Sequence, residues 1–237
     1  MPYYGYYYMS TQEILVYLLL VLPAVILSLW ASHNVNSTYR KYSNVNTSSG
    51  MTANDVVRRI LDANGLHNVR IEHIAGNLTD HYDPKTNVIR LSDSTDGSRS
   101  AAAIGVAAHE AGHAVQHAVG YTPIKIRMAL VPVCNIGSSL AIPLILLSFI
   151  FSIPALATVG IIAFATATVF QLVTLPVEFD ASRRALAILG NGYMSGEDLK
   201  ASKKVLTAAA LTYVAALAVS LANLLRLVAM VNSRRRD

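Results

Sequence analysis

Apolar and polar residues are strongly segregated along this chain of 237 residues. Four continuous apolar runs cover residues 14–31, 128–151, 154–175 and 206–230. Each run approaches or exceeds the ~20 residues that a helix needs to cross the hydrocarbon layer of a bilayer. The pattern predicts four membrane-spanning helices. The second and third are separated by only a few residues, so we expect them to form a hairpin that returns to the side of the membrane it left.

The stretch between the first and second runs has ordinary polarity and is long enough to form a water-soluble unit. Residues 52–61 combine capping side chains with apolar positions at helical spacing, which predicts an amphipathic helix that stops at Gly65. Residues 69–74 alternate like a half-buried strand, and 88–91 form a second short strand after a turn-rich segment at 76–87. We therefore expect a small sheet.

An alanine-rich segment follows, from Ala101 to Val119, and it contains no proline. Ser98 or Ser100 can cap its first turn, and Gly120 can end it. The small side chains would let this predicted helix pack closely against other helices.

The composition agrees with a membrane protein, since 53% of the residues are hydrophobic and only 14% are charged. The first run lacks a basic segment before it and a clear cleavage site after it, so we interpret it as a retained anchor. The tyrosine-rich tip at residues 1–13 suits the headgroup level of a bilayer. A net charge of +5 is explained by membrane orientation, and we expect no nucleic acid partner. The single cysteine, Cys134, excludes an intramolecular disulfide and a thiolate metal cluster.

The most informative motif is H-E-A-G-H at residues 109–113. Residues four apart lie on one face of a helix, so His109 and His113 can present two imidazole nitrogens to one zinc ion. Glu110 projects beside them and can act as a general base, while zinc polarises a scissile carbonyl and lowers the pKa of water towards ~7. Chance would produce this string roughly 0.004 times in a chain of this composition. A solvated helix face that happens to carry these residues is the alternative, and the apolar flanks disfavour it.

His117 continues the four-residue spacing, but it lies about 6 Å further along the helix, so ligation of the same ion would be strained. We expect it to support a ligand, to face the substrate or to lie at the membrane surface. A catalytic zinc needs a third protein ligand. The acidic candidates downstream are Glu178, Asp180, Glu197 and Asp198. The hairpin topology returns Glu178 and Asp180 to the face that carries the histidines, so it selects these two.

The two motifs together, H-E-A-G-H-A-V-Q-H and L-P-V-E-F-D-A-S-R-R-A-L, resemble the YugP-type neutral zinc metallopeptidases, which are related to the HtpX-type membrane proteases. The resemblance implies a gluzincin-like catalytic unit with Glu178 as the third ligand. In the HtpX pattern a Glu is followed by Ala and Asp three and four positions on, whereas here Ala181 and Ser182 follow Glu178. Asp180 is then free to support the ligands from outside the metal's immediate shell.

Helical geometry allows only one of the two carboxylates to be a ligand, and the longer reach of Glu178 favours that residue. Glu178 and Asp180 would point about 200° apart on a helix, so only one of them can face the metal. We expect Asp180 to hydrogen-bond a ligand histidine or to pair with Arg184. Arg183 and Arg184 are candidates for stabilising the oxyanion, although residues of this kind also bind lipid headgroups.

The expected fold is a mainly α multi-pass membrane protein with a small α+β zincin-like catalytic unit. The expected function is hydrolysis of peptides or unfolded protein at the bilayer, with one Zn²⁺ per chain. A non-catalytic zinc-binding scaffold or assembly factor is the alternative, which the presence of Glu110 disfavours, because a structural zinc needs no base. A metal transporter is disfavoured because Arg226 is almost the only ionisable residue in the apolar runs.

These expectations divide the chain into six segments. They are the tip at 1–13, an anchor at 14–31, a soluble catalytic region at 32–127, a transmembrane hairpin at 128–175, a third-ligand segment at 176–205, and a final span with a basic tail at 206–237. The soluble region carries ten Lys and Arg and the third-ligand segment five more, which places the catalytic face in the cytoplasm. The basic tail, Arg234 to Arg236, opposes that orientation.

Overall fold

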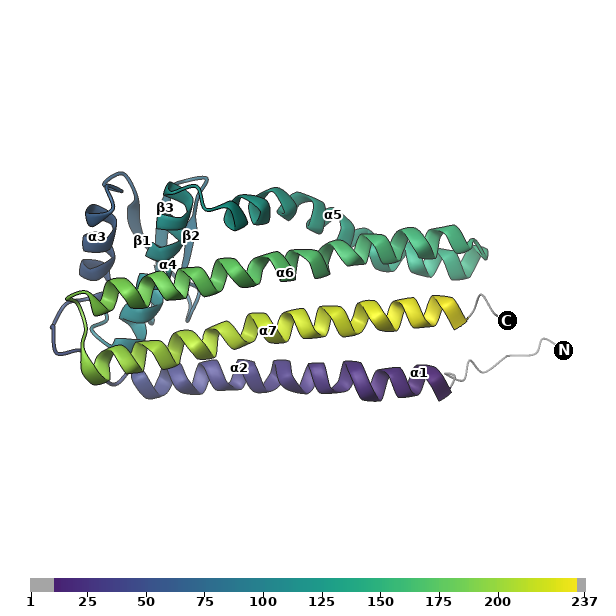
Figure 1. Ribbon diagram of the computed structural model, residues 1–237, viewed down its shortest axis with the longest axis horizontal. Coiled ribbons are helices and arrows are strands. Elements are labelled where there is room, and N and C mark those ends of the chain that lie inside the picture. The colour runs from purple at the N-terminus through teal and green to yellow at the C-terminus, as the bar shows by residue number, and fades with distance from the viewer. Residues whose placement is uncertain (1–10, 234–237) are drawn as a thin grey trace. The chain divides into compact units, whose positions relative to one another are not determined.

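The computed structural model describes the backbone of residues 11–233 and the side chains of residues 14–232. The tyrosine-rich tip, apart from the backbone of residues 11–13, and the basic tail at 234–237 lie outside the described residues. The protein is mainly helical and contains one three-stranded sheet (Figure 1). Its chain divides into two compact units.

Four helical segments are long and apolar enough to cross a membrane, as the sequence predicts. The first consists of α1 (Thr11–Val16), a π-helical turn η1 (Tyr17–Val21) and α2 (Leu22–Tyr42). The others are α5 (Thr122–Phe151), α6 (Pro154–Gly190) and α7 (Gly196–Ser233). These helices extend beyond the apolar runs, because a helix can continue into polar sequence once its backbone hydrogen bonds are propagating.

The first unit comprises the described parts of residues 1–30, 130–172 and 215–237. Its α5 and α6 segments pack closely where each has a glycine. A Cβ on Gly137 would lie 2.3 Å from Thr166 Oγ1, and a Cβ on Gly160 would lie 2.7 Å from Ile145 Cγ1. Large apolar side chains such as Ile150 remain exposed, as expected for a surface that faces lipid. Within this unit the Arg226 guanidinium lies 5.4 Å from the centroid of the Tyr17 ring.

The second unit comprises residues 31–129 and 173–214. Its helix α3 (Ala53–Ala63) begins with a complete capping box, in which Thr52 and Asp55 bond each other's backbone N–H groups. Its apolar face is buried, and Gly65 follows the helix with a φ of +71°. The predicted helix, its cap and its stop are confirmed.

The sheet of this unit contains β1 (Arg70–Ile74), β2 (His81–Asp83) and β3 (Val88–Ser92) in the order β1-β3-β2. Strands β1 and β3 are parallel, and β2 is antiparallel to β3. The two predicted strands are confirmed. The third strand, β2, lies inside the turn-rich segment at 76–87 and was not predicted. Three residues are too few to show a period of two in the sequence.

Helix α4 (Ala101–Ala118) begins at Ser100, whose hydroxyl accepts a hydrogen bond from Ala103 N–H. Most of its side chains are buried, and it packs against α3 in the core of the unit. Its alanines and glycines allow close approach on several sides. A Cβ on Gly112 would lie 2.8 Å from the Ala181 carbonyl oxygen of α6. The backbones of α4 and α6 therefore meet at the H-E-A-G-H segment.

Candidate metal centre

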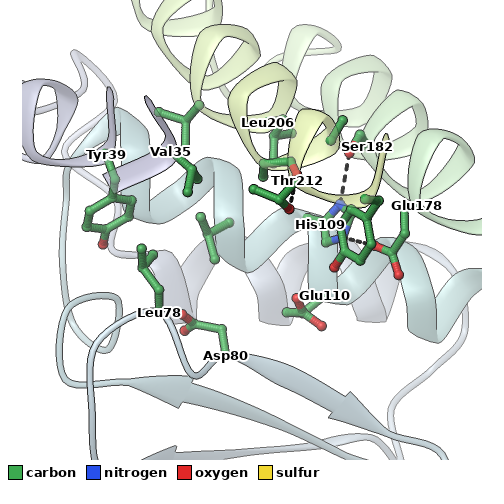
Figure 2. A pocket seen from close by; sticks show the side chains of 15 residues that line it. Val35, Tyr39, Leu78, Asp80, His109, Glu110, Glu178, Ser182, Leu206 and Thr212 are labelled. Atoms are coloured by element: carbon green, nitrogen blue, oxygen red, sulfur yellow. Dashed lines mark hydrogen bonds and ion pairs between the residues drawn. The ribbon is translucent and has the colours of Figure 1, made fainter. Parts of the chain in front are cut away.

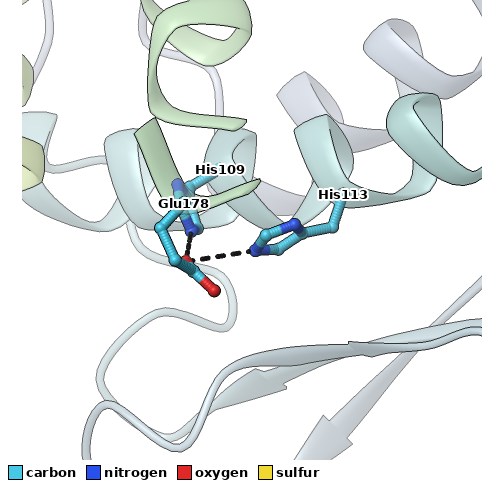
Figure 3. Close-up of side chains that lie close together, drawn as sticks. All are labelled: His109, His113 and Glu178. Carbon is cyan, nitrogen blue, oxygen red and sulfur yellow. Dashed lines mark hydrogen bonds and ion pairs between the residues drawn. The ribbon is translucent and has the colours of Figure 1, made fainter. Parts of the chain in front are cut away.

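Two helices place three potential metal ligands at one point. Helix α4 contributes His109 and His113, one turn apart, and α6 contributes Glu178 (Figure 3). Glu178 Oε2 lies 3.2 Å from His109 Nε2 and 3.5 Å from His113 Nε2. The three ligand atoms all lie within 4.8 Å of one another. Two imidazole nitrogens and one carboxylate oxygen form a donor set that fits a single divalent ion, and this combination is typical of catalytic zinc.

Glu110 lies beside these ligands, and its carboxylate is directed at strand β2. Its side chain is 9% exposed, and its Oε2 accepts a 2.9 Å hydrogen bond from the backbone N–H of Tyr82 in β2. Burial raises the pKa of the Glu110 carboxyl, while the nearby His113 and His109 oppose this rise. A carboxylate with a raised pKa accepts a proton more readily than an exposed one.

Gln116 orients His113. The Gln116 amide nitrogen donates to the Val177 carbonyl at 2.8 Å and to Asp180 Oδ2 at 2.9 Å. Both partners are acceptors, so the amide oxygen must face His113 Nδ1, which lies 3.0 Å away. His113 Nδ1 must then carry the proton, which leaves a lone pair on Nε2 for a metal.

Ser182 Oγ lies 3.1 Å from His109 Nδ1, so Ser182 can orient His109 as Gln116 orients His113. In the sequence Ser182 stands out only as a departure from a related pattern, and Gln116 was not predicted to be functional. Helical spacing could have indicated both, because Gln116 follows His113 by three positions and Ser182 follows Glu178 by four.

Arg127 and Tyr82 also contact the centre. Arg127 Nη1 in α5 lies 3.2 Å from Glu178 Oε1, the carboxylate oxygen that does not face His109. From the sequence, Arg127 was expected only to contribute to membrane orientation, and no role was predicted for Tyr82. No local pattern marks either residue, because both reach the centre from elements remote in sequence.

The remaining candidates lie around this centre. Asp180 is buried and pairs with both Arg183 and Arg184, so the expected pairing with Arg184 is present. Its hydrogen bond towards the histidines goes to Gln116, and not directly to a candidate ligand. Both guanidinium groups are therefore engaged by Asp180, and the Arg184 guanidinium also lies 5.7 Å from the centroid of the Tyr121 ring.

His117 is exposed, with its ring centroid 6.1 Å from that of Tyr82.

A pocket of about 240 Å³ adjoins the centre (Figure 2). His109, Glu110 and Glu178 lie on its wall. Helix α2 adds Val35 and Tyr39. The rest of the wall is mostly apolar and comes from α4, α6, α7 and the loop before β2. It consists of Val106, Ser182, Val205, Leu206, Ala209, Ala210, Thr212, Tyr213, Leu78 and Asp80. A ligand with apolar groups in this pocket would lie against His109, Glu178 and Glu110.

The sequence of this chain matches a known family and a known protein. The model of the family described as "Putative neutral zinc metallopeptidase" matches residues 17–232. The "Putative membrane protease YugP" of Bacillus subtilis (strain 168) is 46% identical over 224 residues, which cover 94% of this chain and 99% of that protein. No solved structure matches the chain at a significant level. The extent of both sequence matches shows that the chain belongs to the neutral zinc metallopeptidase family.

Proposed function

We propose that this chain is a membrane-embedded zinc peptidase with a gluzincin-like catalytic unit, in which Glu110 is the general base. The observation that carries the proposal is the convergence of His109, His113 and Glu178 beside a buried Glu110. The family implies zinc, and the His₂Glu donor set suits that ion. Family membership and the four apolar helices support an enzyme associated with the membrane.

Zinc held by these ligands would polarise the scissile carbonyl and lower the pKa of the attacking water. The protein's own residues would supply the rest. Glu110 would take a proton from the water and pass it to the leaving amine. The Tyr82 N–H holds one Glu110 oxygen in place, which fixes the direction of the other.

The supporting residues keep the ligands in the state that binding requires. Gln116 and Ser182 would each accept a hydrogen bond from the Nδ1–H of a ligand histidine, so that in the neutral imidazole Nε2 remains unprotonated. The guanidinium of Arg127 contacts Glu178 Oε1 and leaves Oε2 directed at the two imidazoles.

The pocket next to the centre supports a peptide substrate. Its volume of about 240 Å³ is below the ~300–1,000 Å³ of sites that enclose drug-sized ligands, so it fits a side chain or two of an extended chain. The wall formed by Val106, Val205 and Leu206 would favour apolar side chains. Peptides and unfolded proteins present such side chains, whereas folded domains bury them.

The test is hydrolysis of casein by purified wild-type protein and its Glu110→Gln variant, with zinc content measured for both. We expect the variant to keep about one zinc per chain and to lose at least 10²-fold in activity, the usual range for a general base. Glu72→Gln, a matched change on β1 outside the pocket, should leave both quantities unchanged. Equal loss of zinc and activity in Glu110→Gln would contradict the role of Glu110. Zinc-loaded wild type without any hydrolysis would favour the scaffold alternative.

A further inference from the structure

A second pocket, of about 580 Å³, lies between α2 and α7 within the second unit. Four lysines line it: Lys41 from α2, and Lys200, Lys203 and Lys204 from α7. We call it the lysine pocket. It shares no lining residue with the pocket at the metal centre.

The lysine pocket has an excess of positive charge. All four lysines are exposed. Glu197 pairs with Lys200 at 2.8 Å, but within the described part of the chain no carboxylate pairs with Lys41, Lys203 or Lys204. The ammonium groups of Lys41 and Lys204 lie 5.5 and 5.7 Å from the centroid of one ring, that of Tyr42. Like charges gathered in this way repel, so an anion between them would be stabilised.

Along both α2 and α7, the residues that line the lysine pocket change from charged at one end to uncharged at the other. On α7 the lysines lie in the first turns, and the lining continues through Ala208 to Leu211, about 10 Å beyond Lys204. On α2 the charged end is Lys41, and the lining continues back to Asn34. The uncharged end therefore points along both helices towards their apolar runs. A ligand that matches this gradient has an anionic head and an apolar tail.

We propose that the lysine pocket binds an anionic phospholipid of the surrounding bilayer. The phosphate lies among Lys41, Lys203 and Lys204, and an acyl chain follows α7 past Leu211. Clusters of basic residues next to a membrane span attract anionic headgroups by charge. A bound lipid would also stabilise the folded protein by mass action.

The test uses detergent-solubilised full-length protein titrated with phosphatidylglycerol, phosphatidylcholine or inorganic phosphate, with bound lipid counted by native mass spectrometry. The Lys41→Gln/Lys204→Gln variant should bind phosphatidylglycerol about fivefold more weakly for each lysine removed. Phosphatidylcholine binding should not change. The control Arg59→Gln/Lys85→Gln removes two charges from exposed sites outside the pocket and should bind like wild type.

Two further measurements keep the result decisive. The Lys41→Arg/Lys204→Arg variant keeps the charge and should retain binding, and thermal unfolding in phosphatidylcholine nanodiscs should show that all variants fold. Wild-type affinity in the Gln variant would overturn the proposal. Displacement of phosphatidylglycerol by inorganic phosphate at similar concentrations would overturn it as well, because the site would then recognise free phosphate and not a lipid.

Discussion

The side-chain amide of Gln116 donates a 2.9 Å hydrogen bond to Asp180 Oδ2 and thereby determines which nitrogen of His113 carries a proton. Asp180 thus acts on the histidine through an intermediate residue. The chain of contacts starts at the arginines that pair with Asp180 and ends at His113, a proposed metal ligand. It is buried along most of its length, so each missing partner would leave an unsatisfied polar group.

Replacing Gln116 by methionine should weaken zinc binding roughly 10–100-fold, the usual effect of losing a group that orients a ligand. The variant keeps the length of the side chain but removes the acceptor for His113 Nδ1–H. Competition with a chromophoric chelator measures the affinity. Asp180→Asn should show a smaller loss, because Gln116 still finds acceptors in the asparagine oxygen and the Val177 carbonyl. Unchanged affinity in Gln116→Met would show that the tautomer of His113 does not depend on this contact.

Glu178 and Asp180 should respond differently to truncation. Glu178→Ala removes a proposed ligand and should yield protein without zinc after purification. Asp180→Ala should retain zinc but lose roughly 10–100-fold in affinity or activity. Elemental analysis of the two purified variants measures the difference. A zinc-replete Glu178→Ala beside a metal-free Asp180→Ala would reverse the assignment of the third ligand.

The contact between Gly112 and Ala181 should tolerate no added side chain. A Cβ on Gly112 would meet the Ala181 carbonyl oxygen at 2.8 Å, so Gly112→Ala must separate α4 from α6 and move Glu178 away from the histidines. We expect loss of zinc and of activity. Gly105→Ala is the matched control, because its Cβ would lie 3.1 Å from Ser202 Cβ and 3.4 Å from Ser202 Cα, farther than the 2.8 Å at Gly112, and helix propensity would gain up to about 1 kcal/mol. Equal zinc content in the two variants would contradict the proposed helix contact.

The capping box of α3 should make stability depend on pH. The hydrogen bond from the Thr52 hydroxyl, and after it the one from the Thr52 backbone N–H, lowers the pKa of Asp55 below its usual value. The capping box therefore stabilises the fold fully when the pH is above the pKa of Asp55 in the unfolded chain. This stabilisation is lost as the pH falls through the lower pKa of Asp55 in the folded protein. Thr52→Ala should cost about 1 kcal/mol at neutral pH, and less once Asp55 is protonated. Chemical unfolding of wild type and variant at several pH values measures both effects. A constant difference between them across this range would contradict the linkage.

The orientation in the membrane remains a prediction from the basic residues. In a Cys134→Ala background, a cysteine at the exposed Asn77 should react with a membrane-impermeant thiol reagent only after the cells are opened. Cysteine at Ser94, beside β3, should behave in the same way. Labelling of either position in intact cells would place the metal centre outside the cytoplasm.

Much of the local structure follows from the sequence alone. Long apolar runs must be helical in a bilayer, because each backbone polar group there needs a partner within the segment. The cap of α3, the Ser100 cap of α4 and the two longer strands depend on neighbouring residues, so short-range patterns predict them. The spacing of His109 and His113 likewise places both imidazoles on one face before any tertiary contact exists.

The tertiary structure decided how distant segments meet. Whether Glu178 or Asp180 faces the histidines depends on the rotation of α6 against α4 at Gly112, which no local pattern encodes. Strand β2 is too short to show a period, and it exists because β3 offers it an edge. Tyr82 and Arg127 reach the centre from elements remote in sequence, since a contact of this kind arises from packing and leaves no spacing along the chain. The sequence by itself therefore determined the spans, the capped helices and the pair of histidines, whereas only packing decided which carboxylate joins them and which residues hold the ligands in place.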